Sequence, residues 1–136
     1  MKNIVILFIL LIFPLFAIAD EFVPEFNKMQ TIQCDFEETL FNEDNNVASI
    51  SKKFRIYKLD DENKKIYLEK EPIGHIKYFG ADKVEFSMQI MTDESIGMAN
   101  IIIDRKTLEY SMQSRITYDF FGTKTSRATG ICKIIP

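Results

Sequence analysis

The best-spaced carboxylates and the single histidine are the side chains of this chain that could act as acids or bases. Asp35 and Glu37 are two residues apart, about 7 Å along an extended strand, a spacing at which paired carboxyl groups can serve glycoside hydrolysis. The polar face of any solvent-exposed strand has the same pattern. His75 follows Gly74 without an accompanying Gly-x-Ser-x-Gly motif, so we interpret it as a loop residue and not as part of a Ser-His-Asp triad. The sequence predicts no catalytic residue.

The sequence predicts no metal or cofactor site. Asn42, Asp44 and Asn46 imitate the first three oxygen ligands of a calcium loop. Val47 stands where that loop needs glycine, and Lys53 stands where it needs a bidentate glutamate. Two cysteines and one histidine are too few for a Cys/His zinc site with the usual spacing. We therefore interpret residues 42–46 as a turn between strands.

The two cysteines, Cys34 and Cys132, lie near the two ends of the predicted mature chain. In an oxidising compartment their simplest interpretation is one disulfide, which would close a loop of roughly a hundred residues and tie the first strand to the last. Two free buried thiols and an intermolecular pair are the alternatives. The pairing of the chain ends is therefore a prediction that depends on export.

The first nineteen residues have the pattern of a secretory signal peptide. Lys2 supplies a basic start, residues 4–16 are apolar except for Pro14, and Ala17-Ile18-Ala19 form an Ala-x-Ala cleavage site. Residues 4–19 fall short of the about twenty apolar residues that cross a bilayer, and acidic residues follow them. We predict that residues 1–19 are removed, that residues 20–136 form a single β domain without stable membrane insertion, and that this domain is periplasmic or extracellular.

The charge balance of the mature chain excludes two classes of partner. Without Lys2, 16 basic residues stand against 20 acidic residues. Affinity for nucleic acids comes from clustered lysine and arginine, so nucleic-acid binding is not expected. An anionic membrane surface is disfavoured for the same reason.

The elements that must position these side chains are strands, because hydrophobicity alternates with a period of two from Thr31 onward. The clearest alternation spans residues 84–90, with apolar side chains at the even positions and polar ones at the odd positions. A tight turn at residues 104–107 joins two β-forming segments into a predicted hairpin. Strands are predicted at residues 31–40, 48–59, 65–70, 75–79, 84–90, 98–103, 108–116 and 124–134.

Seven or eight short strands without a crossover helix predict an all-β antiparallel meander. Closure into a complete or nearly complete barrel would hide the sheet edges, and a two-sheet β-sandwich is the alternative. Phe22, Phe26 and Met29 recur at helical spacing and predict a short N-terminal helix within residues 20–30.

Two sets of side chains are candidates for binding. Large apolar residues of the predicted strands could line a ligand cavity or form the core: Phe86, Met88, Ile90, Met98, Tyr110 and Met112. A basic patch on the predicted final strands could receive an anionic ligand or partner, or protect an exposed edge from aggregation: Lys106, Arg115, Lys124 and Arg127.

The sequence as a whole favours an exported, non-enzymatic barrel that needs no cofactor and binds either a protein partner or a small apolar ligand. This expectation follows from the signal peptide, the domain size, the predicted disulfide and the lack of a catalytic motif. The alternative is a small hydrolase of cell-envelope material that uses carboxylates such as Asp35 and Glu37.

Overall fold

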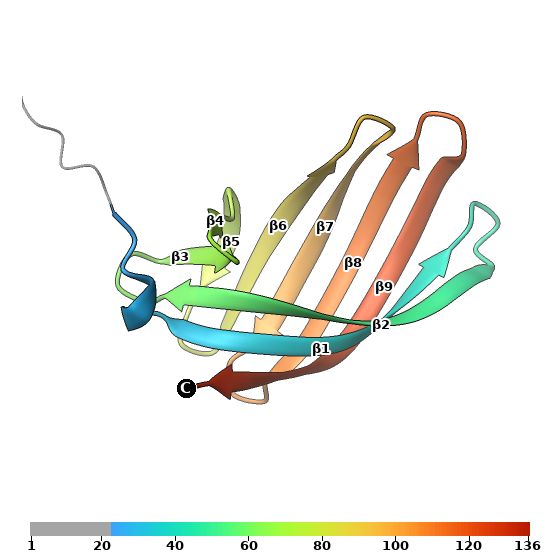
Figure 1. Ribbon diagram of the computed structural model, residues 1–136. Coiled ribbons are helices and arrows are strands. Elements are labelled where there is room, and N and C mark those ends of the chain that lie inside the picture. The colour runs from blue at the N-terminus through green and yellow to red at the C-terminus, as the bar shows by residue number, and fades with distance from the viewer. Residues whose placement is uncertain (1–22) are drawn as a thin grey trace, which may run out of the picture.

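A computed structural model describes residues 23–136, which form one curled antiparallel sheet of nine strands (Figure 1). The predicted signal peptide, residues 1–19, lies outside the described residues. The strands are β1 (Gln30–Phe41), β2 (Val47–Asp60), β3 (Lys65–Leu68), β4 (Glu71–Pro72), β5 (His75–Phe79), β6 (Lys83–Met91), β7 (Ser95–Asp104), β8 (Glu109–Tyr118) and β9 (Gly122–Ile135). The predicted all-β antiparallel meander is confirmed.

Strands that follow each other in the chain pair with each other, except at one point of the described sheet. The order across the sheet is β4-β3-β2-β1-β9-β8-β7-β6-β5, so β1 pairs with β9. The two edge strands, β4 and β5, are consecutive in the chain and are separated by Ile73 and Gly74. The strands therefore form a ring that is open between β4 and β5, a gap called the seam below. This single barrel-like sheet replaces the two-sheet sandwich that the sequence left as an alternative.

Two details of the predicted elements are corrected. The strand expected over residues 65–70 ends at Leu68, because Glu69 adopts a positive φ of 58° and turns the chain into β4. The sequence predicted seven or eight strands, and β4 is an additional one. Pro72 is tolerated in β4 because this strand lies at an edge of the sheet. The helix expected within residues 20–30 is a single 3₁₀ turn, η1 (Phe26–Lys28), because Met29 is already extended as the chain approaches β1.

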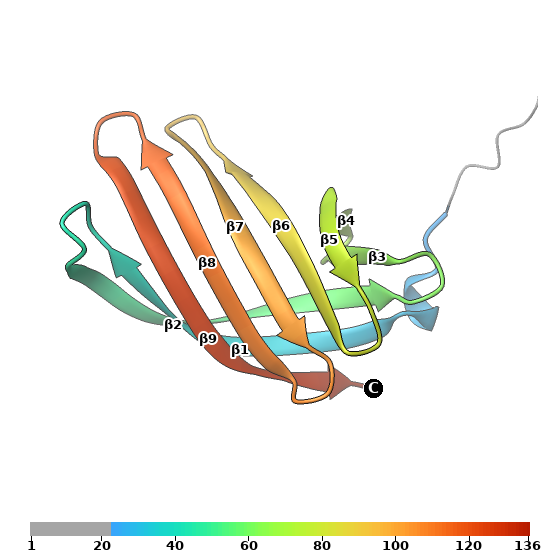
Figure 2. The ribbon, with the colours of Figure 1, turned by 180° about the vertical axis from the view of Figure 1, so that it is seen from behind.

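The curled sheet has two different ends (Figures 1 and 2). The base is the end that carries the β5–β6 and β7–β8 turns, where the first half of β1 and the second half of β2 cross over β6 to β9, in front of them in Figure 1 and behind them in Figure 2. The mouth is the opposite end, which carries the β1–β2, β6–β7 and β8–β9 turns. The sheet therefore folds over itself near the base and flares apart toward the mouth.

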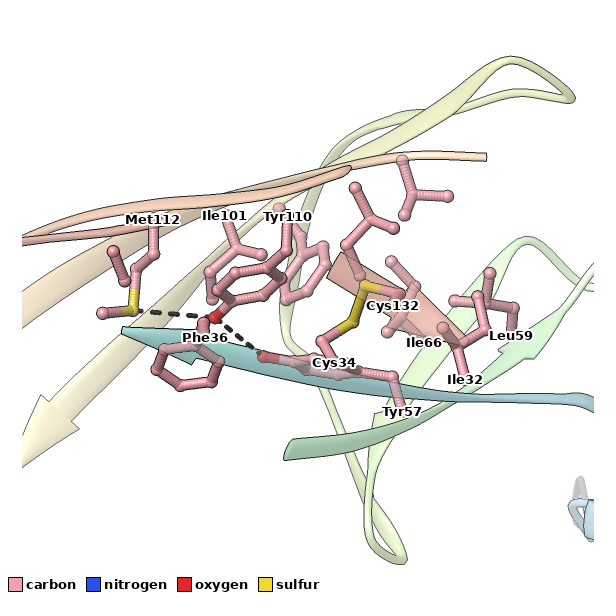
Figure 3. Packing of buried hydrophobic residues seen from close by; sticks show 14 of the residues in the cluster. Ile32, Cys34, Phe36, Tyr57, Leu59, Ile66, Ile101, Tyr110, Met112 and Cys132 are labelled. Atoms are coloured by element: carbon pink, nitrogen blue, oxygen red, sulfur yellow. Dashed lines mark hydrogen bonds between the residues drawn. A yellow bond between two sulfur atoms is a disulfide. The ribbon is translucent and has the colours of Figure 1, made fainter. Parts of the chain in front are cut away.

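The hydrophobic core lies between the crossing strands of the base. Side chains alternate between an inner and an outer face along each strand, and the inner ones of the base half are buried. Figure 3 shows many of them packed around the disulfide. The buried cluster consists of Ile32, Cys34, Phe36, Tyr57, Leu59, Ile66, Val84, Phe86, Ala99, Ile101, Ile103, Tyr110, Met112, Ala128 and Cys132.

The predicted disulfide between Cys34 and Cys132 is confirmed. The two residues are direct partners in the register of β1 and β9, and both are buried in the core. The bridge joins strands at opposite ends of the chain, with a sequence separation of 98 residues. The covalent link therefore reinforces the pairing that closes the ring on the side opposite the seam.

Arg105, in the β7–β8 turn, connects two other turns and the start of β1 at the base. Its guanidinium donates to both carboxylate oxygens of Asp61 at 2.7 and 3.0 Å, to the backbone oxygen of Gly80 at 3.0 Å and to Oε1 of Gln30 at 3.1 Å. These partners belong to the β2–β3 turn, the β5–β6 turn and the start of β1. One side chain from the β7–β8 turn thus holds both sides of the seam together at the base.

Candidate functional site

A hollow of about 680 Å³ lies at the seam, within the size range of small-molecule sites. We call it the seam pocket. Its walls come from the β3–β4 side of the gap and from β5, β6 and β7 on the other side. The lining residues are Leu68, Glu69, Glu71, Pro72, Ile73, Gly74, His75, Ser87, Met88, Gln89 and Met98.

The pocket exists because the strands on the two sides of the seam differ in length. His75, the first residue of β5, pairs with Ser87, so residues 88–91 of β6 have a strand neighbour only in β7. On the other side β4 is two residues long and ends at Pro72, which has no backbone N–H to donate. A Cβ built at Gly74 meets no atom within 4 Å. The sheet therefore leaves open space, instead of a strand pairing, beside the mouth half of β6.

Arg55 lies on the inner face of β2, directly behind one wall of this pocket. Its Nη1 is 3.9 Å from Sδ of Met88 and 3.9 Å from Sδ of Met112, and the guanidinium carbon is 5.7 Å from the centre of the Phe36 ring. Met88 is thus shared between the seam pocket and the surroundings of Arg55. Within residues 23–136, no carboxylate lies within ion-pair distance of this guanidinium.

A short hydroxyl network continues from this position into the core (Figure 3). The hydroxyls of Tyr57 and Tyr110 are 3.4 Å apart, and that of Tyr110 donates to Sδ of Met112 at 3.8 Å. Burial raises the pKa of Tyr110 far above its ordinary value, and the neighbouring Tyr57 adds to that shift. The Tyr110 hydroxyl consequently stays protonated at neutral pH and acts as a donor inside the core.

Charged side chains on the inner face become more frequent toward the mouth. Register places Glu38 and Lys53 on this face, and Lys53 Nζ is 3.4 Å from the Glu38 carboxylate. Lys124 also points inward, with its Nζ 5.3 Å from the centre of the Tyr118 ring. Together with Arg55, these residues give the inner face of β1, β2 and β6 to β9 three cations and one acid, on a chain whose formal net charge is −3.

The six apolar residues predicted to line a cavity or form the core lie in three environments. Phe86, Tyr110 and Met112 are buried core residues, and Ile90 is half-buried against the core. Met88 and Met98 line the seam pocket, where Met98 lies on the outer face and is 52% exposed. The structure thus brings two of the predicted methionines to the seam and assigns the other four residues to core packing.

The four residues predicted as a basic patch are not brought together. Arg115 and Arg127 are diagonal neighbours on the outer face, where Arg115 opposes Thr125. Lys124 lies on the inner face, because strand alternation turns it away from Arg127. Lys106 is in the β7–β8 turn at the base, at the opposite end of β8 from Arg115. These four basic residues therefore do not form one charged surface.

The acidic pair lies away from the seam. Asp35 and Glu37 project from the exposed outer face of β1, beside a shallow hollow of about 660 Å³ that also contacts Phe54 and Ile131. Asp35 accepts a hydrogen bond from Gln33 at 3.0 Å. His75 lines the seam pocket on β5 instead. The structure therefore separates the histidine from the carboxylates that the hydrolase alternative would use.

Sequence reasoning missed Arg55. Apolar residues occupy both parities around it, with Phe54 and Ile56 on one side of the strand and Tyr57 and Leu59 on the other. Alternation within β2 therefore did not indicate which face is internal. The signal is the pairing of β2 with β1, which aligns Arg55 with the buried Cys34, and it becomes visible once the register is known.

Residues 23–136 contain no group of three His, Cys, Asp or Glu side chains arranged to hold a metal ion. No helix in this described range is long and apolar enough to cross a membrane. Comparison of the sequence with protein-family models and with curated proteins finds no match.

Proposed function

We propose that this protein is an exported binding protein that holds a small, largely apolar molecule in the seam pocket. The observation that carries the proposal is the apolar hollow of about 680 Å³ at the one gap in the described ring of strands. Leu68, Ile73, Met88 and Met98 supply its apolar surface. Methionine side chains adapt to ligands of varied shape, which suits a binding wall.

The geometry supports binding in preference to hydrolysis. A pocket with apolar walls gains affinity by removing apolar ligand surface from water, and it requires no reactive group. Asp35 and Glu37, on which the hydrolase alternative depends, lie on the outer face of β1 and outside this pocket. The proposal therefore assigns the seam a binding role without a chemical step.

Export is part of the proposal. Its support is the signal-peptide pattern of residues 1–19 together with the disulfide, which is consistent with an oxidising compartment. We expect the protein recovered from its natural location to begin at Asp20 and to contain no free thiol. Intact mass measurement before and after alkylation checks both features. A mass that includes residues 1–19 would contradict the export proposal.

Binding is tested with N-phenyl-1-naphthylamine, an uncharged apolar dye whose fluorescence rises in apolar surroundings. Met98→Lys introduces a charge into the pocket wall at a half-exposed position where the fold should tolerate it. We expect dye affinity to fall by about tenfold or more, because the lysine must lose solvation when the dye binds. Met91→Lys is the matched control, since Met91 is 66% exposed on the same mouth half and does not line the pocket.

The control should bind the dye as the unmodified protein does. Absence of dye binding by the unmodified protein would contradict the proposal. Equal loss of affinity in Met91→Lys and Met98→Lys would also contradict it, because the effect would then not be local to the seam.

A further inference from the structure

We infer that the ligand of the seam pocket is an anionic amphiphile, and that Arg55 binds its charged headgroup. This inference rests on the proposed function of the seam pocket and goes further by naming the chemical class of the ligand. It concerns an acidic headgroup with two or more terminal oxygens, carboxylate or phosphate, on an aliphatic chain.

The first step is that, among residues 23–136, the Arg55 guanidinium has no anionic partner within ion-pair distance. An arginine side chain has five N–H donors in a planar fork that matches carboxylate and phosphate oxygens. The Arg55 guanidinium contacts two thioether sulfurs at 3.9 Å, the Phe36 ring at 5.7 Å and the neighbouring Tyr57 side chain, and none of these groups is an anion at neutral pH. A half-buried cation in such surroundings has given up much of its hydration without an anionic partner. An added anion would supply that partner.

The second step is the position of the nearest carboxylate on the same face. Glu38 belongs to β1, where it pairs with Ser51, whereas Arg55 aligns with Cys34, two inner-face positions further along. The Glu38 carboxylate already lies 3.4 Å from Lys53 Nζ. The inner face is thus left with an excess of cations, Arg55 and Lys124, that an anionic group can balance.

The third step is the path between the pocket and Arg55. Met88 both lines the seam pocket and contacts Arg55 Nη1, so it is the side chain that separates the two spaces. Its unbranched thioether has several rotatable bonds and can move aside at low cost. An aliphatic chain in the pocket could therefore place its headgroup against the guanidinium.

The fourth step is the orientation that the charges favour. Glu69 and Glu71 lie on the exposed rim of the pocket, on the β3–β4 side. Acids at the outer rim and a cation behind the inner wall direct a negative headgroup inward and oppose the reverse orientation. The site would therefore distinguish an anionic amphiphile from a neutral or cationic one of the same length.

The test measures binding of three ligands with the same twelve-carbon chain by isothermal titration calorimetry: laurate, dodecyl phosphate and 1-dodecanol. Measurements are made below the critical micelle concentration and at a mildly alkaline pH, where both acids are ionised. We expect the unmodified protein to bind at least one of the anions about tenfold or more tightly than dodecanol, as one charge-assisted interaction allows. The stronger of the two anions then identifies the headgroup as carboxylate or phosphate.

Arg55→Met removes the charge and keeps an apolar side chain of similar length. We expect this variant to lose the preference for the anion, with a drop of about tenfold or more, while its affinity for dodecanol stays unchanged. Unchanged dodecanol binding also shows that the variant is folded. Lys52→Met is the matched control, because it removes the same charge from the exposed outer face of the same strand. It should retain the anion preference.

Two results would overturn the inference and leave the seam pocket as a binding site. The unmodified protein could bind dodecanol as tightly as both anions, or Arg55→Met could lose dodecanol and anion affinity equally. If the unmodified protein bound neither the three ligands nor the uncharged dye, the proposed function itself would fail. The two failures are therefore distinguishable.

Discussion

The base and the mouth of the sheet use the same long strands, β1, β2 and β6 to β9, in opposite ways. At the base, crossing strands enclose a buried core, the disulfide joins β1 to β9, and Arg105 links turns on both sides of the seam. At the mouth, the inner face carries charged side chains and the hairpin tips expose large apolar ones, with Phe120 89% and Phe121 72% exposed. Binding regions are commonly drawn from the less stable parts of a fold. The difference indicates that the base holds the fold while the mouth half and the adjacent seam remain available for a ligand.

The largest expected contrast between the two ends comes from removing one aromatic ring from each. Phe86 is fully buried and packs edge-on against Tyr57 at 5.4 Å. We expect Phe86→Ala to lower the free energy of unfolding by about 3–5 kcal/mol. Phe120→Ala, at the mouth, should change it by less than about 0.5 kcal/mol. Urea unfolding monitored by circular dichroism measures both, and comparable losses in the two variants would contradict the division.

The disulfide, which joins the first and last strands, also tests whether the base stabilises the fold. Replacing Cys34 and Cys132 by alanine should lower the free energy of unfolding by about 2–4 kcal/mol, because the unfolded chain is no longer constrained across 98 residues. The double variant should still bind the apolar dye where it remains folded, since neither cysteine lines the seam pocket. Urea unfolding with and without dye measures both effects. A loss below about 0.5 kcal/mol would contradict a stabilising role for the bridge.

Arg105 gives a smaller effect that also has a defined pH dependence. Arg105→Gln should cost about 1–3 kcal/mol, because the β2–β3 turn, the β5–β6 turn and the start of β1 lose charge-assisted hydrogen bonds. The hydrogen bond from Arg105 and its charge lower the pKa of Asp61 below its ordinary value of 3.8. Stability from this pair is therefore present above that ordinary value and is lost as the pH falls through the lower, folded-state pKa.

Asp61→Asn sharpens this prediction. The Asp61 side chain is half-exposed, so solvent and salt screen the ion pair. We expect the variant to be slightly less stable than the unmodified protein near neutral pH, with the difference vanishing in acid. Thermal unfolding across a pH series measures the difference. A difference in stability between the two proteins that increased toward acid pH would contradict a stabilising ion pair between Asp61 and Arg105.

The elements predicted best from sequence are those with local signals. Residues 84–90 alternate strictly, and β6 spans them as Lys83–Met91. The turn at residues 104–107 was recognisable because aspartate favours turns, where its side chain can accept backbone hydrogen bonds. In the structure Asp104 accepts such bonds from the N–H groups of Lys106 and Thr107. The pairing of β1 with β9 followed from Cys34 and Cys132, since a disulfide requires its two strands to be close.

The seam was not predictable from the same signals. It depends on where β5 stops beside β6 and on the positive φ of Glu69, which ends β3. Arg55 was missed for a related reason, because its face is decided by the register against β1 and not by the sequence of β2 alone. Both features are consequences of long-range pairing, which a period-two pattern does not encode.

The measurement that tests the central claim most directly is a two-dimensional ¹H–¹⁵N NMR titration of the ¹⁵N-labelled protein with laurate. We predict that the shifted amides cluster at the seam, around Leu68, Ile73 and Met88, and extend to Arg55, while the base around Arg105 stays unchanged. Shifts confined to the outer hollow around Phe54 and Ile131, or no shifts at saturating laurate, would contradict the claim that the seam is the binding site.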